Sequence, residues 1–160
     1  MSFEITQTFL DDQRNVSPKN ASAAIIVNKY DQVLLQLRDD KEGIFFPNHW
    51  GFFGGASEDG EEFSKGLIRE LEEELTIVFD YDQIKQYIRV DLGFDVAQPL
   101  VKRVFYIVSI TDHQTEQLQL KEGKACRFFS REESLTIPNF TPYDRYALWV
   151  YFNQKRIQLG

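Results

Sequence analysis

The sequence predicts an α+β domain in which two main helices cover a mixed β-sheet. Three observations support this prediction. Several short runs rich in β-branched and aromatic residues are typical of strands, two longer segments repeat apolar residues at helical spacing, and the length of 160 residues suits one domain. Hydrophobic residues make up 42% of the chain, which is enough for a folded core.

The first half of the chain is predicted to contain a hairpin, a loop, a short strand and a helix. Residues 21–28 and 32–38 are apolar runs on either side of a polar turn, which indicates a β-hairpin. A long loop over residues 39–50 leads to a short strand, Gly51-Phe52-Phe53, which ends at Gly54-Gly55. A helix is expected from about residue 62 to residue 76.

The second half is predicted to contain three strands and a final helix. Strands are expected at 87–96, 101–110 and 126–129, with a polar loop over 111–124 before the last of them. The final helix is expected to run from Thr141 to about residue 156. Thr141 suits the N-cap, Pro142 suits the first helical position, and Asp144 falls in the first turn, where a negative charge is favourable.

The net charge of −7 is concentrated in one segment. Residues 58–74 hold eight acidic and two basic side chains, whereas the rest of the chain holds 17 acidic and 16 basic ones. A basic face for duplex nucleic acid is therefore not expected. One cysteine and two histidines exclude a disulfide framework and a multi-thiolate zinc site.

Neither a membrane span nor a secretory signal is expected. The longest apolar runs fall far below the ~20 residues that a membrane span needs. The first residues, MSFEITQTF, lack the basic and apolar regions of a secretory signal. We therefore expect a cytoplasmic protein without a membrane partner.

Three glutamates of the predicted acidic helix share one face. At about 100° per residue, Glu70, Glu73 and Glu74 fall within an arc of about 100°. A solvated helix face is the simplest interpretation, but carboxylates fixed on one helix also suit a hard divalent cation. Because this face carries charge and no apolar packing, we expect Glu74→Gln to leave the stability of the metal-free protein nearly unchanged. The apolar stripe consists of Leu67, Ile68, Leu71 and Leu75.

The segment GGASEDGEEFSKGLIRELEEELTI resembles the Nudix box, G-x5-E-x7-R-E-U-x-E-E-x-G-U, where U is aliphatic. Gly55, Glu61, Arg69-Glu70 and Glu73-Glu74 match at the fixed spacing. The resemblance implies a Nudix-like α/β/α sandwich formed by a single domain over residues 1–160. In that domain the box occupies residues 55–77, and residues 1–20 are an N-terminal extension or an edge strand.

The main departure from the box is Thr76, which stands where the family has glycine. A glycine just past a helix usually adopts a positive φ, which a β-branched residue resists. We therefore expect either a different helix exit or a strained turn. Because the carboxylates precede this point, metal binding is expected to survive the change.

The resemblance implies hydrolysis of a nucleoside diphosphate linked to another group, by water attack on a phosphorus atom with Mg²⁺ or Mn²⁺ as cofactor. Metal ions are needed because a pyrophosphate is polyanionic and repels both hydroxide and carboxylates. The substrate would be a nucleoside triphosphate or a nucleotide sugar. The resemblance also implies the metal ligands, which are Glu70, Glu73, Glu74, Glu61 and the Gly54 carbonyl, with Arg69 orienting Glu61.

Other site residues are candidates with simpler alternatives. The proton acceptor is one of the box glutamates or a loop acid, for which Glu122 is the first candidate and Glu116 the competitor. Either loop acid could equally be a solvated side chain. Substrate contacts could come from aromatic, basic or amide side chains, although each could instead serve in the core, at a strand end or in a turn. These candidates are Arg38, Phe46, Trp50, Phe52 and Asn139.

Two other functions remain open at the level of sequence. A Nudix-like domain could sense a nucleotide without cleaving it, which Thr76 favours and the intact glutamates disfavour. A prenyl diphosphate isomerase of similar fold would need a reactive cysteine in its site, whereas Cys126 lies in a predicted core strand. A homodimer is expected only by analogy with the family.

Overall fold

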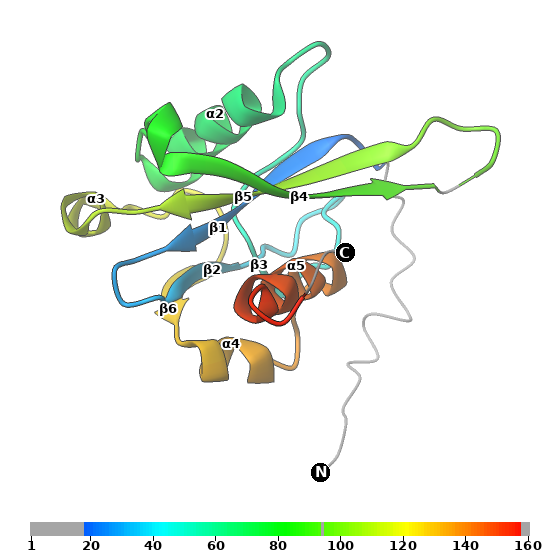
Figure 1. Ribbon diagram of the computed structural model, residues 1–160. Helices are drawn as coiled ribbons and strands as arrows, with labels where there is room; N and C mark the ends of the chain where they lie inside the picture. The colour runs from blue at the N-terminus through cyan, green and yellow to red at the C-terminus, as the bar shows by residue number, and fades with distance from the viewer. Residues whose placement is uncertain (1–17, 94, 158–160) are drawn as a thin grey trace.

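The computed structural model describes residues 18–93 and 95–157 of the chain. The expected extension or edge strand at residues 1–20 therefore lies almost wholly outside the described residues. Figure 1 shows the elements in chain order, which are β1 (Ala21–Val27), β2 (Val33–Leu37), β3 (Trp50–Gly51), α2 (Phe63–Leu75), the 3-10 helix η1 (Tyr81–Gln83), β4 (Ile84–Leu92), β5 (Val101–Ser109), α3 (Asp112–Gln117), β6 (Ala125–Phe129), α4 (Arg131–Thr136) and α5 (Pro142–Asn153).

The strands form the mixed sheet that the sequence predicts. Their order is β3-β2-β1-β5-β4, and β6 pairs with β2 as well. β1 runs antiparallel to β2 and parallel to β5, and its pairing with β5 extends along its whole length. Residues beyond β3 continue along β1, because Phe53 pairs with Ala24 and Ala56 with Ala21. The Gly54-Gly55 segment is thereby held against the central strand.

The sheet lies between two layers of helix, with α2 on one face and α5 on the other (Figure 1). Successive side chains of a strand point to opposite faces. Ala24 and Ile26 of β1 therefore join the core beneath α2, whereas Ala23 and Ile25 join the core beneath α5. This two-sided burial explains why β1 is a continuous apolar run, and it confirms the predicted α/β/α layering.

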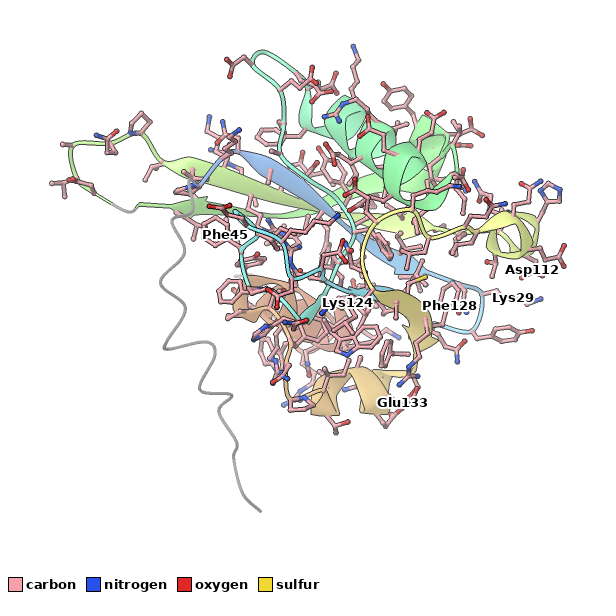
Figure 2. The ribbon with its side chains drawn as sticks, turned by 180° about the vertical axis from the view of Figure 1, so that it is seen from behind. Lys29, Phe45, Asp112, Lys124, Phe128 and Glu133 are labelled. Carbon is pink, nitrogen blue, oxygen red and sulfur yellow. The ribbon has the colours of Figure 1, made fainter. Side chains whose placement is uncertain are left out.

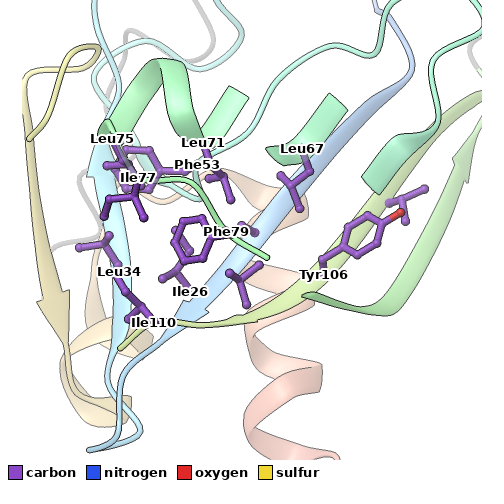
Figure 3. Close-up of a cluster of buried hydrophobic side chains, with 13 residues drawn as sticks. Ile26, Leu34, Phe53, Leu67, Leu71, Leu75, Ile77, Phe79, Tyr106 and Ile110 are labelled. Atoms are coloured by element: carbon purple, nitrogen blue, oxygen red, sulfur yellow. The ribbon is translucent and has the colours of Figure 1, made fainter. Parts of the chain in front are cut away.

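Helix α2 is held to the sheet by its apolar stripe. Leu67, Leu71 and Leu75 are fully buried at spacings of four residues, and they pack with Phe79 and Tyr106 (Figure 3). Burying each leucine side chain contributes roughly 1.5–3 kcal/mol. The stripe therefore fixes the rotation of the helix that carries Glu70, Glu73 and Glu74.

Two short helices replace parts of the chain that the sequence analysis predicts as loop or leaves unassigned. α3 begins with a capping box formed by Thr111 and Gln114, and α4 begins with one formed by Ser130 and Glu133. α3 is also tied to the β1–β2 turn, because Lys29 and Asp112 form an ion pair at 2.6 Å (Figure 2). The predicted polar loop over 111–124 is therefore wrong for its first part.

Helix α5 begins as predicted, with Thr141 as N-cap and Pro142 as first residue, but it ends at Asn153. The Thr141 side chain makes no capping hydrogen bond. Asp144 is fully buried rather than solvated in the first turn. Its carboxylate accepts hydrogen bonds from the Phe52 amide at 2.9 Å and from Arg103 at 3.1 Å. Asp144 thus ties α5 to β5 and to the residue that follows β3.

Thr76 ends α2 in the left-handed conformation, with φ 60° and ψ 23°. Its amide donates to the Glu72 carbonyl at 2.9 Å, as a glycine at this position would do. Of the two outcomes that the sequence left open, the structure therefore shows the strained turn. Among the described residues, no helix combines the length and the apolar character needed to cross a membrane.

We expect Thr76→Gly to raise the free energy of unfolding by about 0.5–1 kcal/mol. Relief of the left-handed strain, about 1–2 kcal/mol, exceeds the extra entropy of glycine in the unfolded chain. Urea denaturation followed by circular dichroism measures the change. Thr76→Ala is the matched control, because alanine keeps the Cβ atom and should show no gain. A Thr76→Gly protein no more stable than wild type would contradict the prediction.

Candidate metal and nucleotide site

The carboxylate of Glu74 joins α2 to the Gly54-Gly55 segment. Its Oε2 accepts a hydrogen bond from the Gly54 amide at 2.9 Å, and its Oε1 lies 3.4 Å from the side-chain nitrogen of Gln36. Gln36 also donates to the Phe52 carbonyl. Glu74 is only 7% exposed. A buried carboxylate therefore lies where the helix, β2 and the glycine segment meet.

The two glycines allow this close approach, and Gly54 is the one that the backbone requires. A Cβ on Gly55 would lie 2.3 Å from a carboxylate oxygen of Glu70. Gly54 has a φ of +125°, and a Cβ there would lie 2.3 Å from the Ser22 carbonyl. The carbonyls of Phe53 and Gly55 accept the amides of Ala24 and Ser22, so strand alternation directs the Gly54 carbonyl away from β1.

Arg69 organises the remaining carboxylates. Its guanidinium bonds both oxygens of Glu61 at 3.1 Å and one oxygen of Glu70 at 2.7 Å, and it lies 3.5 Å from Glu73. The Glu58 amide holds Glu61 as well. Such forked contacts fix the orientation of a carboxylate. Arg69 thus positions Glu61 and Glu70 beside the glycine segment.

Burial and mutual repulsion disturb the titration of these acids. Burial raises the pKa of Glu74 to about 8, the charges of Glu70 and Glu122 add to the rise, and the Gly54 amide opposes it. Burial also raises the pKa of Glu70, against the opposing effect of Arg69. The Arg69 hydrogen bonds instead lower the pKa of Glu61. The positive charge near Glu70 and Glu74 is therefore too small to offset the effect of burial on their pKa values.

The expected exposed face of three glutamates is correct for Glu73 and wrong for Glu74. Glu73 is exposed, Glu70 is half-buried, and Glu74 is buried. The helical wheel places Glu74 at the border of the apolar stripe. A wheel gives the direction of a side chain but does not show which other segment covers the end of the helix. That cover is the segment after α3, in which Lys121 donates its amide to the Glu74 carbonyl.

The donor set of this cluster suits a hard divalent cation, because every side-chain ligand offered is a carboxylate oxygen. Two of these carboxylates are partly or fully buried with raised pKa, so a cation beside them would relieve their repulsion. In their present rotamers, the described acidic, histidine and cysteine side chains form no group of three that could hold a metal ion.

Glu122 follows Lys121, whose amide donates to the Glu74 carbonyl, so Glu122 lies near this cluster. Its charge contributes to the raised pKa of both Glu70 and Glu74, and its own side chain is exposed. Glu116, the competing loop acid, is exposed on α3. Of the two, Glu122 is thus the one whose charge reaches the buried carboxylates.

Of the predicted substrate contacts, some pack within the protein and others line a cleft. Phe52 is 1% exposed and packs edge-on against Phe105 and Phe140, so its prediction as a substrate contact is wrong. Trp50 packs edge-on against Phe129 at 4.9 Å, and its amide donates to the Asn139 carbonyl. Strand alternation explains the error, because it turns Phe52 into the core beneath α5.

Arg38 and Phe46 line a cleft of about 530 Å³ beside the glycine segment. Lys19, Gly54, Arg103 and Tyr143 also line it, and no described carboxylate does. We call it the basic cleft. Trp50 and Asn139 are not among the described residues of its wall.

Sequence reasoning missed Arg103 and the role of Tyr143. Arg103 lies on β5, bonds the buried Asp144, and stacks its guanidinium 4.0 Å from the centre of the Tyr143 ring. The ring of Phe46 meets Tyr143 edge-on at 5.5 Å. A charged residue within an apolar strand was the available signal for Arg103, but its partners Tyr143 and Asp144 come from α5, which lies far along the chain.

A second cleft, of about 1100 Å³, opens on the other side of Ala56. Its wall includes Glu58, Asp59, Glu61 and Glu70, with Arg69 among them. We call it the acidic cleft. Ala56 and Lys19 border both clefts, so the two lie side by side with opposite charge.

In the metal-free protein, we expect the free energy of unfolding to fall as the pH rises from about 4.5 to about 8. Unfolded Glu74 loses its proton near 4.5, whereas folded Glu74 keeps it to about 8, so the folded state binds more protons in this window. Each pKa unit corresponds to about 1.4 kcal/mol. Glu74→Gln removes this contribution, so the variant should gain stability over wild type as the pH rises.

Urea denaturation with a chelator, at about pH 5 and about pH 8.5, measures this difference. Glu72→Gln is the matched control, because Glu72 is exposed on the same helix. Wild type and Glu74→Gln proteins with the same dependence on pH would contradict the prediction. This expectation replaces the earlier one, which assumed that Glu74 is exposed.

The family model of the NUDIX domain matches residues 17–149. A comparison with curated protein sequences finds no significant match.

Several solved structures share the fold. One is a MutT structure from work on the Aliivibrio salmonicida and Vibrio cholerae proteins, with 23% identity, a TM-score of 0.67, and 84% of this chain and 97% of that chain covered. Another is a MutT Nudix hydrolase from Burkholderia pseudomallei, with 22% identity, a TM-score of 0.65, and 83% and 97% covered.

A third similar structure is the Nudix domain of Shewanella oneidensis NrtR, solved in complex with ADP-ribose. Its identity to this chain is 17%, its TM-score is 0.64, and 99% of this chain and 100% of that chain are covered. The family model spans most of the chain and includes the helix and glycine segment described above. This chain is therefore a member of the Nudix family.

Proposed function

We propose that the protein hydrolyses a nucleoside diphosphate linked to another group, a nucleoside triphosphate or a nucleotide sugar, with the aid of Mg²⁺ or Mn²⁺. The observation that carries the proposal is the pair of carboxylates of half-buried Glu70 and buried Glu74, which both lie against Gly54-Gly55 and have raised pKa values. Burying like charges together is costly for a purely structural purpose. Membership of the Nudix family supports this use of the cluster.

Glu70, Glu73 and Glu74 would hold the metal, together with Glu61 and the Gly54 carbonyl. When bound, a divalent metal neutralises the diphosphate and lowers the pKa of water. Arg69 keeps Glu61 and Glu70 in place by its forked contacts. Its own charge offsets part of their repulsion.

The attacking water must lose a proton as its oxygen bonds to phosphorus and the anhydride bond breaks. A carboxylate near the diphosphate would accept that proton. Glu122 is the leading acceptor, because its side chain is exposed and its charge acts on Glu70 and Glu74. Glu74 is the second candidate, because its carboxylate lies against the glycine segment of the site.

A domain that binds a nucleotide without cleaving it is the alternative. The strained Thr76 turn, which departs from the family box, is the observation in its favour. The Shewanella oneidensis Nudix domain was solved with ADP-ribose, which makes this compound a useful probe of simple binding. The complete set of glutamates favours the hydrolase.

A panel of nucleotides with Mg²⁺ or Mn²⁺, with products identified by phosphorus NMR, tests the proposed function. Reaction in ¹⁸O-labelled water should place the label in one phosphate product, which shows water attack on phosphorus. Retention of every nucleotide intact, together with tight binding of one of them, would instead favour the binding domain.

We expect Glu73→Gln and Glu74→Gln to lower kcat by roughly 10²–10⁴-fold, because each removes a charge that the metal or the proton transfer needs. Glu72→Gln should stay within about twofold of wild type, since Glu72 is exposed beside them without contacting the glycine segment. Initial rates at saturating metal measure the effect. Equal activity of the Glu72 and Glu73 variants would count against the assignment.

A further inference from the structure

Negative and positive side chains are separated into the two clefts that meet at Ala56. The chain carries a net charge of −7, and the acidic cleft follows this bias. The basic cleft opposes it, because Lys19, Arg38 and Arg103 line it without a described carboxylate in the wall. A concave site with unbalanced positive charge favours an anion.

Arg103 is held ready in one orientation. Asp144, which is fully buried, accepts from its Nη2 at 3.1 Å, and the Tyr143 ring lies beneath the guanidinium plane. The Asp144 carboxylate is fixed in turn by the Phe52 amide. The Nε of Arg103 is buried and has no hydrogen-bond partner among the described residues. A guanidinium that is already held in one orientation loses little entropy when a ligand binds.

Arg38 adds a charge that the described part of the chain does not neutralise. Its Nε donates to the Phe45 carbonyl at 2.9 Å. Phe45, labelled in Figure 2, lies in the loop before β3 and also lines the cleft. No described carboxylate forms an ion pair with Arg38, so its two Nη groups are left for a ligand. Arg38 at the end of β2 and Arg103 on β5 thus line the same cleft.

We infer that Arg38 and Arg103 bind a phosphate group beyond the nucleoside diphosphate, so that the preferred substrate is a nucleoside polyphosphate rather than a nucleotide sugar. This inference rests on the proposed function. Guanidinium groups match the oxygens of a phosphate with paired, charge-assisted hydrogen bonds. A neutral sugar offers only hydroxyls, which would leave the Arg38 charge without a counterion.

Matched substrates test the inference by activity. ATP and ADP-glucose share a base and a diphosphate, as do GTP and GDP-glucose, and differ in the group that the basic cleft would receive. We expect wild type to prefer the triphosphate of the better pair by at least about tenfold in kcat/KM. Arg38→Gln should reduce that preference at least about fivefold, chiefly through a higher KM. An unchanged preference in Arg38→Gln would overturn the inference.

Arg127→Gln is the matched control. Arg127 is an exposed arginine on β6 that pairs with Glu133, and it is not in the described wall of the basic cleft. The variant removes the same charge from the chain and should keep the substrate preference of wild type. A loss equal to that of Arg38→Gln would show a general charge effect and overturn the inference.

Pyrophosphate binding to the metal-free protein, measured by calorimetry, tests the cleft without turnover. We expect Arg38→Gln to weaken this binding at least about tenfold and Arg127→Gln to leave it within about twofold. Arg103→Lys should also weaken it, and lysine keeps a charge beside Asp144 so that the fold survives. Wild type without measurable pyrophosphate binding, or Arg38→Gln with unchanged binding, would overturn the inference.

The two tests separate the inference from the proposed function. Suppose that pyrophosphate binding depends on Arg38 but the protein cleaves no nucleotide. That result would overturn the proposed hydrolase activity and support the phosphate site. Suppose instead that the protein prefers nucleotide sugars and that Arg38→Gln does not change pyrophosphate binding. That result would support the proposed hydrolase activity and overturn the phosphate site.

Discussion

The hydrogen bond from the Gly54 amide to the carboxylate of Glu74 is the contact on which the site depends. It fixes the end of α2 against the segment that follows β3, and it does so with a residue that is 7% exposed. A buried carboxylate is stable only where donors or cations compensate its charge. The leucine stripe of α2 supplies the packing that keeps Glu74 in this unfavourable place.

Carboxylates and arginines are used in two opposite ways around Ala56. In the acidic cleft, one arginine, Arg69, orients two carboxylates, and negative charge remains in excess. Arg103 of the basic cleft is oriented by Asp144, a buried carboxylate outside the described wall, and positive charge remains in excess in that wall. In the proposed function, cations would lie at the acids, and further phosphate oxygens would find donors in the basic cleft. The arrangement therefore suits an extended anion across the Gly54–Ala56 segment.

The chain belongs to the Nudix family, and its departure from the family box falls in one backbone turn. Thr76 adopts the left-handed conformation that glycine would adopt, so the helix exit is kept at a cost in strain. The carboxylates precede this turn, and the core beneath α2 is continuous with Ile77 and Phe79. The strain thus bears on stability more directly than on the orientation of the glutamates.

The sequence by itself determined the mixed sheet, both main helices and the family, because these follow from local periodicity and from a motif of fixed spacing. It could not decide the burial of Glu74 or of Phe52. A helical wheel and a strand pattern give the direction of a side chain but not what covers it. Only the tertiary structure brought Arg103 of β5, Tyr143 of α5 and Arg38 at the end of β2 around one cleft, with Asp144 of α5 bonded to Arg103 behind its wall. Such contacts join residues far apart in the chain, and no local pattern records them.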